Sequence, residues 1–155
     1  MIRVLIVDDS KVIREHLEYI LSAEPGFEIV GVATNGEEGV ELAHQARPDV
    51  ITMDLNMPSR NGIEATRRIM ESIPTPIVIV SSNWSPHRTG MTFEAMEAGA
   101  VAVTETPLGI GHPKFEESAT EFARTLRQMA ALKVTKRGLK GWKEAVSTTM
   151  RIPQR

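Results

Sequence analysis

The chain alternates between short runs of apolar residues and longer stretches in which apolar residues recur every three or four positions. Short runs of this kind predict buried strands, and the longer stretches predict amphipathic helices. The expected strands are Val4–Val7, Phe27–Ala33, Val50–Met53, Ile77–Val80 and Val101–Val103. The Ile77–Val80 run is apolar at every position, which is typical of a strand whose sheet is covered by helices on both faces.

A helical pattern follows each of these runs. After the first run, Ser10 is a candidate N-cap, and Ile13, Leu17 and Leu21 then lie on one side of a helix. Asn35-Gly36 is expected to form a turn before the second helix. The further helices are expected at about 37–46, after Gly62 with Ile63, Ile69 and Met70, at about 86–98, and over the apolar positions Phe115, Ala119, Phe122, Leu126 and Met129.

Five strand–helix repeats predict an α/β fold, namely a doubly wound five-stranded parallel sheet with helices on both faces. The length of 155 residues suits one such domain, which we place at residues 1–132. Residues 133–155 carry seven Lys and Arg residues and one acid, Glu144. We therefore expect a basic tail or linker there, and a connector to a partner or an effector domain is the alternative interpretation.

Composition narrows the class of protein. Hydrophobic residues make up 41% and charged residues 25% of the chain, so a soluble globular core is expected. The formal net charge of −2 gives no reason to expect nucleic acid or a membrane as a partner. The absence of cysteine excludes disulfides, zinc–thiolate sites and thiol catalysis. With no signal peptide and no apolar stretch of spanning length, we expect a cytoplasmic protein.

Carboxylates stand at the ends of two of the expected strands. Asp8 and Asp9 follow Val4–Val7, and Asp54 follows Val50–Met53. In an open parallel sheet, the carboxyl ends of the strands form the edge where ligands bind. Crowded carboxylates repel one another unless a cation neutralises them, and ligand sets made only of oxygen suit Mg²⁺. The sequence therefore predicts a metal-assisted acidic pocket in which one acid is a candidate nucleophile.

Three segments together resemble the receiver domain of response regulators: Val4–Ser10, Met53–Pro58 with the following Gly62, and Val78–Ser82. They occur in the family's order and spacing over about residues 1–107, which is far more specific than any one motif. Ile79–Ser82 and the Phe115–Arg137 segment are most similar to the receiver of the chemotaxis protein-glutamate methylesterase CheB. The resemblance implies a flavodoxin-like strand order of 2-1-3-4-5.

The resemblance also implies the roles of the site residues. Asp54 would be the phosphoacceptor of a two-component system, modified by a histidine kinase in a Mg²⁺-dependent reaction. The ion would be bound by Asp8, Asp9, Asp54 and the backbone carbonyl of Asn56. The Ser81 hydroxyl would bond a phosphoryl oxygen once Asp54 is modified.

Two positions depart from the family pattern. Thr106 stands where the family places a lysine before a proline, so a neutral hydroxyl replaces a charged donor. Val103 stands where many members carry an aromatic switch residue. Lys11, which follows the acidic pair, is expected to be an exposed side chain at the start of a helix rather than a substitute for the lysine.

Three functions remain open from the sequence. The first is a phosphorylation-controlled receiver that changes conformation and signals to a chemotaxis or effector protein. The second is the regulatory fragment of a CheB-type methylesterase. The third is a degenerate receiver that acts as a constitutive interaction module, for which Thr106 is the main support. In none of them is the chain itself an enzyme, and it has no Gly-x-Ser-x-Gly nucleophile elbow.

Overall fold

The strands form one parallel sheet in the order β2-β1-β3-β4-β5 in a computed structural model that describes residues 1–58, 61–81 and 86–135. The strands are β1 (Ile2–Val7), β2 (Phe27–Ala33), β3 (Val50–Asp54), β4 (Ile77–Ser81) and β5 (Ala102–Glu105). The helices are α1 (Lys11–Ala23), α2 (Gly36–Ala46), α3 (Asn61–Ser72), α4 (Pro86–Ala98) and α5 (Phe115–Ala130). The predicted fold class and strand order are confirmed.

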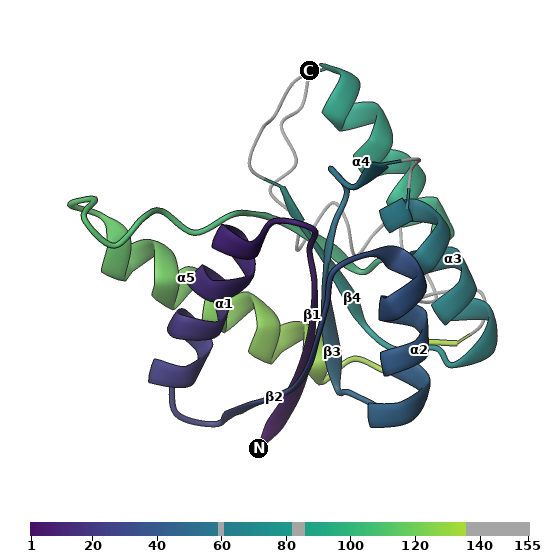
Figure 1. The fold of residues 1–155 in the computed structure, drawn as a ribbon, viewed down its shortest axis with the longest axis horizontal. Helices are drawn as coiled ribbons and strands as arrows, with labels where there is room; N and C mark the ends of the chain where they lie inside the picture. The colour runs from purple at the N-terminus through teal and green to yellow at the C-terminus, as the bar shows by residue number, and fades with distance from the viewer. Residues whose placement is uncertain (59–60, 82–85, 136–155) are drawn as a thin grey trace.

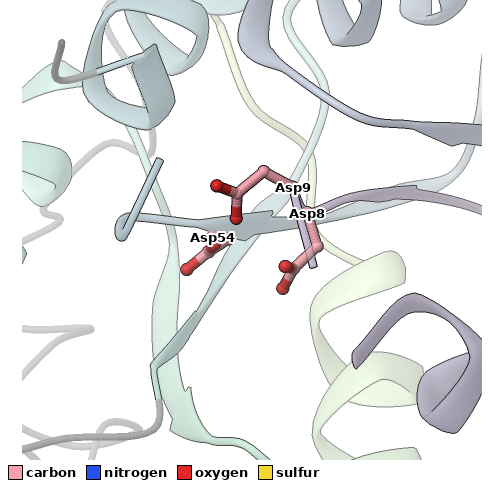
Figure 2. A group of neighbouring side chains, drawn as sticks. All are labelled: Asp8, Asp9 and Asp54. Atoms are coloured by element: carbon pink, nitrogen blue, oxygen red, sulfur yellow. The ribbon is translucent and has the colours of Figure 1, made fainter. Parts of the chain in front are cut away.

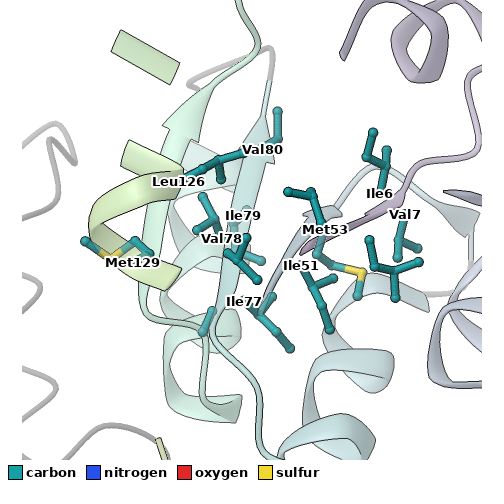
Figure 3. Close-up of a cluster of buried hydrophobic side chains, with 14 of the residues drawn as sticks. Ile6, Val7, Ile51, Met53, Ile77, Val78, Ile79, Val80, Leu126 and Met129 are labelled. Carbon is teal, nitrogen blue, oxygen red and sulfur yellow. The ribbon is translucent and has the colours of Figure 1, made fainter. Parts of the chain in front are cut away.

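Helices cover both faces of the sheet (Figure 1). Helices α1 and α5 lie on one side, and α2, α3 and α4 lie on the other. The central strands are buried between these layers, and Ile51, Ile77 and Ile79 have no exposed surface. In Figure 3 the side chains of Leu126 and Met129 on α5 pack against β4 from one side. Burial on both faces explains why these strands have continuous apolar sequences.

Polar side chains define where two helices begin. Ser10 is the N-cap of α1, as predicted, and its hydroxyl accepts a hydrogen bond from the Ile13 N–H at 3.3 Å. Asn35 is the N-cap of α2, because its side-chain oxygen accepts a hydrogen bond from the Glu38 N–H at 2.8 Å. The turn predicted at Asn35-Gly36 is therefore a helix start, and Gly36 is already helical.

Strand β5 differs from its predicted range of Val101–Val103. It begins at Ala102 and continues to Glu105, which pairs with Ser81 of β4. Apolar residues mark only the buried part of a strand, whereas backbone pairing with β4 determines where the strand ends. The two polar residues Thr104 and Glu105 therefore belong to β5 although their side chains are not buried.

The end of the described chain remains attached to the core. Leu132 and Val134 are partly buried against the hydrophobic core after α5 has ended. Residues 136–155, most of the predicted basic tail, lie outside the described residues, as does Ser82 of the third motif. The domain boundary at residue 132 thus stays a prediction.

Candidate functional site

Three carboxylates meet at the carboxyl-terminal edge of the sheet. Asp8 and Asp9 directly follow β1, and Asp54 is the last residue of β3. Strands β1 and β3 are neighbours, and Val7 pairs with Met53. The acids that follow these two residues therefore lie side by side at the same edge of the sheet. Each acid offers an oxygen within 4.8 Å of the others (Figure 2). The clustering predicted from the two strand ends is therefore present.

Burial makes the negative charge of Asp54 unfavourable. The residue is only 6% exposed, and this burial is the main reason why the pKa of its carboxyl is raised to about 7. The Asn56 N–H donates to Asp54 Oδ1 at 2.9 Å and acts in the opposite direction by lowering the pKa. Repulsion from Asp8 and Asp9 raises the pKa further. A cation placed among the three acids would offset the cost of burying the Asp54 charge and the repulsion from Asp8 and Asp9.

Asp8 is held in this cluster of acids by two hydrogen bonds. Its backbone N–H donates to the Ala33 carbonyl at 3.1 Å, and its Oδ1 accepts a hydrogen bond from the Ser10 N–H at 2.9 Å. Burial raises the pKa of the Asp8 carboxyl, while the Ser10 N–H and the Arg14 charge lower it. Asp9 is exposed to solvent, so the two neighbouring acids differ in environment. The sequence, in which they are adjacent and identical, does not reveal this difference.

The donor set fits a hard divalent cation. Carboxylate oxygens of three acids converge on one centre, and Asn56, two residues beyond Asp54, is exposed. Among the described residues, no histidine belongs to a group that could hold a metal. The arrangement can thus bind a cation beside a buried carboxylate, which is a setting for nucleophilic attack on an electrophilic phosphorus.

Ser81 and Thr106 are brought to the same edge by β4 and β5. Asp54 pairs with Val80, so Ser81 lies one residue beyond it on the neighbouring strand. Ser81 is buried, and its carbonyl accepts a hydrogen bond from the Thr106 N–H at 3.0 Å. Thr106 is half-buried. Both residues that the sequence singled out for the phosphoryl group therefore lie next to each other.

Two further expectations can be checked against the geometry. Lys11 is exposed, and its Nζ lies 4.0 Å from Glu15 Oε2. This agrees with the expectation that Lys11 is a solvent-exposed side chain at the start of a helix. Val103 is buried in β5 with 6% of its surface exposed. A short aliphatic side chain thus fills the position where an aromatic residue would be expected.

Arg14 is a residue of the site that the sequence analysis missed. Its Nη1 donates to the backbone carbonyl of Asp8 at 2.9 Å. The pKa of the Glu38 carboxyl on α2 is lowered mainly by hydrogen bonds from Thr34, and the Arg14 charge adds a smaller effect in the same direction. A signal was present in the sequence, because a cation in the first turns of a helix is unfavourable unless it has a partner.

No helix in the described part of the chain is both long and apolar enough to cross a bilayer. This agrees with the apolar runs in the sequence, which are all too short.

Comparisons with known proteins agree with the geometry. The family model of the response regulator receiver domain matches residues 4–110. A protein-glutamate methylesterase/protein-glutamine glutaminase of Nitrosospira multiformis is 49% identical over 137 residues. The alignment covers 88% of this chain and 39% of that protein, so the chain spans about two fifths of the length of this curated relative.

Solved structures of similar proteins include a response regulator domain and a chemotaxis protein. The response regulator domain of Thermotoga maritima CheB has 41% sequence identity and a TM-score of 0.74, and the match covers 86% of this chain and 98% of that one. The Vibrio cholerae chemotaxis protein CheY4 has 30% identity and a TM-score of 0.65, with 81% and 98% of the two chains covered. The similarity to the CheB domain thus extends over almost all of that domain.

Proposed function

The chain belongs to the response regulator receiver domain family, and from this premise we propose that Asp54 is the residue through which it receives a phosphoryl group. It is a receiver domain of the CheB type and acts in two-component signalling as a regulatory domain, not as a methylesterase catalytic domain. The observation that carries the proposal is the buried Asp54 carboxylate at the end of β3, within 4.8 Å of Asp8 and Asp9.

We propose Mg²⁺ as the cofactor, bound by the carboxylates of Asp8, Asp9 and Asp54 and by the Asn56 carbonyl. This choice is supported by the three converging side-chain ligands, each of which is a carboxylate oxygen. When bound, the ion would offset the repulsion between carboxylate and phosphate. Asp8 would contribute as a buried, hydrogen-bonded acid and Asp9 as the solvent-facing one.

Asp54 acts as the nucleophile in this proposal. One oxygen already accepts the Asn56 N–H, which leaves the other oxygen to form the bond to phosphorus while the bond to the donor's leaving group breaks. The phosphodonor is the phosphohistidine of a histidine kinase or a small acyl phosphate. The Ser81 hydroxyl and the neutral Thr106 hydroxyl then act as hydrogen-bond donors to phosphoryl oxygens.

The partners we propose are a histidine kinase upstream and a chemotaxis effector downstream, in the cytoplasm. The curated relatives carry the name protein-glutamate methylesterase, which supports a second form of the proposal in which this receiver regulates such a catalytic domain. A receiver that is never switched is the remaining candidate, and the neutral Thr106 favours it because the charged donor of the family is missing.

The test is incubation with acetyl phosphate in the presence and absence of Mg²⁺, followed by intact mass measurement. We expect one phosphoryl adduct that requires Mg²⁺, that hydroxylamine removes, and that Asp54→Asn abolishes. Glu71→Gln is the matched control, because Glu71 is an exposed acid near the end of α3 and is not one of the three clustered acids. Retention of the adduct at unchanged yield in Asp54→Asn would show that the assignment of Asp54 is wrong.

A further inference from the structure

Arg14 fixes the peptide group that joins the two neighbouring acids. Its side chain reaches back from α1, and Nη1 donates to the carbonyl oxygen of Asp8 at 2.9 Å. That carbonyl and the N–H of Asp9 belong to the same planar peptide unit. A hydrogen bond from a charged donor is among the stronger ones in proteins, so the plane of this unit is well defined.

Asp9 depends on that plane more than Asp8 does. The carboxylate of Asp8 has its own bond from the Ser10 N–H, and its backbone N–H is held by Ala33. Within the described parts of the chain, no hydrogen bond to the Asp9 side chain is found, and the residue is exposed. The direction in which Asp9 leaves the backbone toward Asp54 therefore follows from the peptide unit before it (Figure 2).

We propose that Arg14 is a positioning residue for the cation site, acting through the Asp8–Asp9 peptide unit. The inference rests on the proposed function, because it assumes that the three acids bind Mg²⁺. By holding the Asp8 carbonyl, Arg14 keeps the Asp9 carboxylate within reach of the ion that Asp54 and Asp8 face. Residues that orient metal ligands in this way affect affinity without touching the metal.

A purely electrostatic role for Arg14 predicts the opposite sign. A positive charge near the site repels a cation, so its removal would strengthen Mg²⁺ binding. Removal of a positioning hydrogen bond weakens binding instead. The direction of the change in Mg²⁺ affinity therefore separates the two roles.

The experiment is calorimetric titration of the metal-free protein with Mg²⁺, using wild type, Arg14→Met, Arg14→Gln and Arg67→Met. We expect Arg14→Met to lower the affinity roughly tenfold, at the lower end of the range for residues that orient metal ligands. Arg14→Gln is expected to recover part of this loss, because its amide can donate to the Asp8 carbonyl without a charge. Arg67→Met should match wild type, since Arg67 is an exposed α3 residue paired with Glu64.

Amide exchange at Asp9 and Ser10 provides a second readout without phosphorylation, and we expect it to be faster in Arg14→Met than in wild type. Unchanged or tighter Mg²⁺ binding by folded Arg14→Met would overturn the inference while leaving the proposed function intact. If wild type itself does not bind Mg²⁺, the proposed metal site and this inference are both wrong. Should Arg14→Met fail to fold, Arg14→Gln decides, because it removes the charge and keeps only a shorter donor: positioning predicts weaker binding than wild type, and equal or tighter binding contradicts it.

Discussion

Asp54 is the residue on which the proposed chemistry depends, and its surroundings oppose its negative charge. Burial and the neighbouring Asp8 and Asp9 all raise its pKa, and within the described part of the chain the only counteracting group is the Asn56 N–H. A buried carboxyl with raised pKa is a common property of functional sites. The charged form that nucleophilic attack requires is thus unfavourable until a cation is present.

The raised pKa makes stability depend on pH in a defined direction. Between about pH 4 and pH 7 the folded Asp54 keeps its proton while the unfolded one has lost it, so the folded state binds more protons. The contribution of Asp54 to stability is therefore largest below this range and is lost as pH rises through about 7. In the absence of metal, Asp54→Asn should be more stable than wild type at pH 8, by about 2–4 kcal/mol, with little difference near pH 4.

Urea unfolding of both proteins across this pH range measures the effect. Saturating Mg²⁺ should reduce the difference at pH 8, because the ion balances the charge of Asp54 in wild type. If the stability difference between wild type and Asp54→Asn does not change with pH, the ionisation of Asp54 is not its cause.

Thr106 is the second residue whose identity has a measurable consequence. It lies beside Ser81 at the site, where a charged donor would distinguish the phosphorylated from the unmodified state. Thr106→Lys should therefore enlarge the conformational response to beryllofluoride, read as the change in amide exchange across residues 102–107. Thr120→Lys introduces the same residue on the exposed side of α5 and should respond like wild type.

Equal responses of wild type and Thr106→Lys at equal beryllofluoride occupancy would mean that the missing lysine is not what limits the switch. The degenerate-receiver candidate would then lose its main support.

Among the secondary-structure elements, the contact between β3 and the start of α3 is unusually close. A Cβ placed on Gly62 would overlap the backbone carbonyl oxygen of Asp54 and would also approach Leu55. Glycine is therefore required at position 62, because the backbones of α3 and β3 are too close for any side chain there. Because the overlapped atom belongs to Asp54 itself, the packing of α3 helps to set the position of the proposed phosphoacceptor.

Gly62→Ala should shift β3 or α3 and destabilise the protein by about 1–3 kcal/mol, the usual effect of overpacking. It should also slow phosphorylation from acetyl phosphate, because Asp54 moves.

Gly90→Ala is the matched control: Gly90 is an exposed residue of α4 with open space around its Cβ position. That control is expected to gain up to about 1 kcal/mol from helix propensity and to keep full phosphorylation. Thermal unfolding and initial rates measure both effects, and a Gly62→Ala protein as stable and active as wild type would contradict the close contact.

For the whole molecule, the extent of the described core leads to a prediction about a shortened chain. Its buried residues extend from Val4 to Met129, with Leu132 and Val134 packed against them. A protein ending at Thr135 should therefore keep its melting temperature within about 2 °C and its phosphorylation on Asp54. A larger loss, measured by thermal unfolding of the two lengths side by side, would show that residues 136–155 belong to the domain.

The fold was largely predictable because its signals are local. The Ile77–Val80 run, the Ser10 cap and the acids after β1 and β3 each follow from neighbouring residues, and the strand order followed from the family resemblance. What the sequence could not reveal depends on contacts between distant segments. The extension of β5 to Glu105 is set by pairing with Ser81, and the bond from Arg14 to the Asp8 carbonyl forms only once α1 folds back on the site.

The central claim is that the acid at the end of β3 accepts the phosphoryl group. The most direct test is to treat the Mg²⁺-loaded protein with acetyl phosphate, trap the acyl phosphate by borohydride reduction, and locate the reduced residue by tandem mass spectrometry. We predict reduction at Asp54 and at neither Asp8 nor Asp9. Reduction at another acid, or none in a protein shown to be folded and metal-bound, would contradict the account.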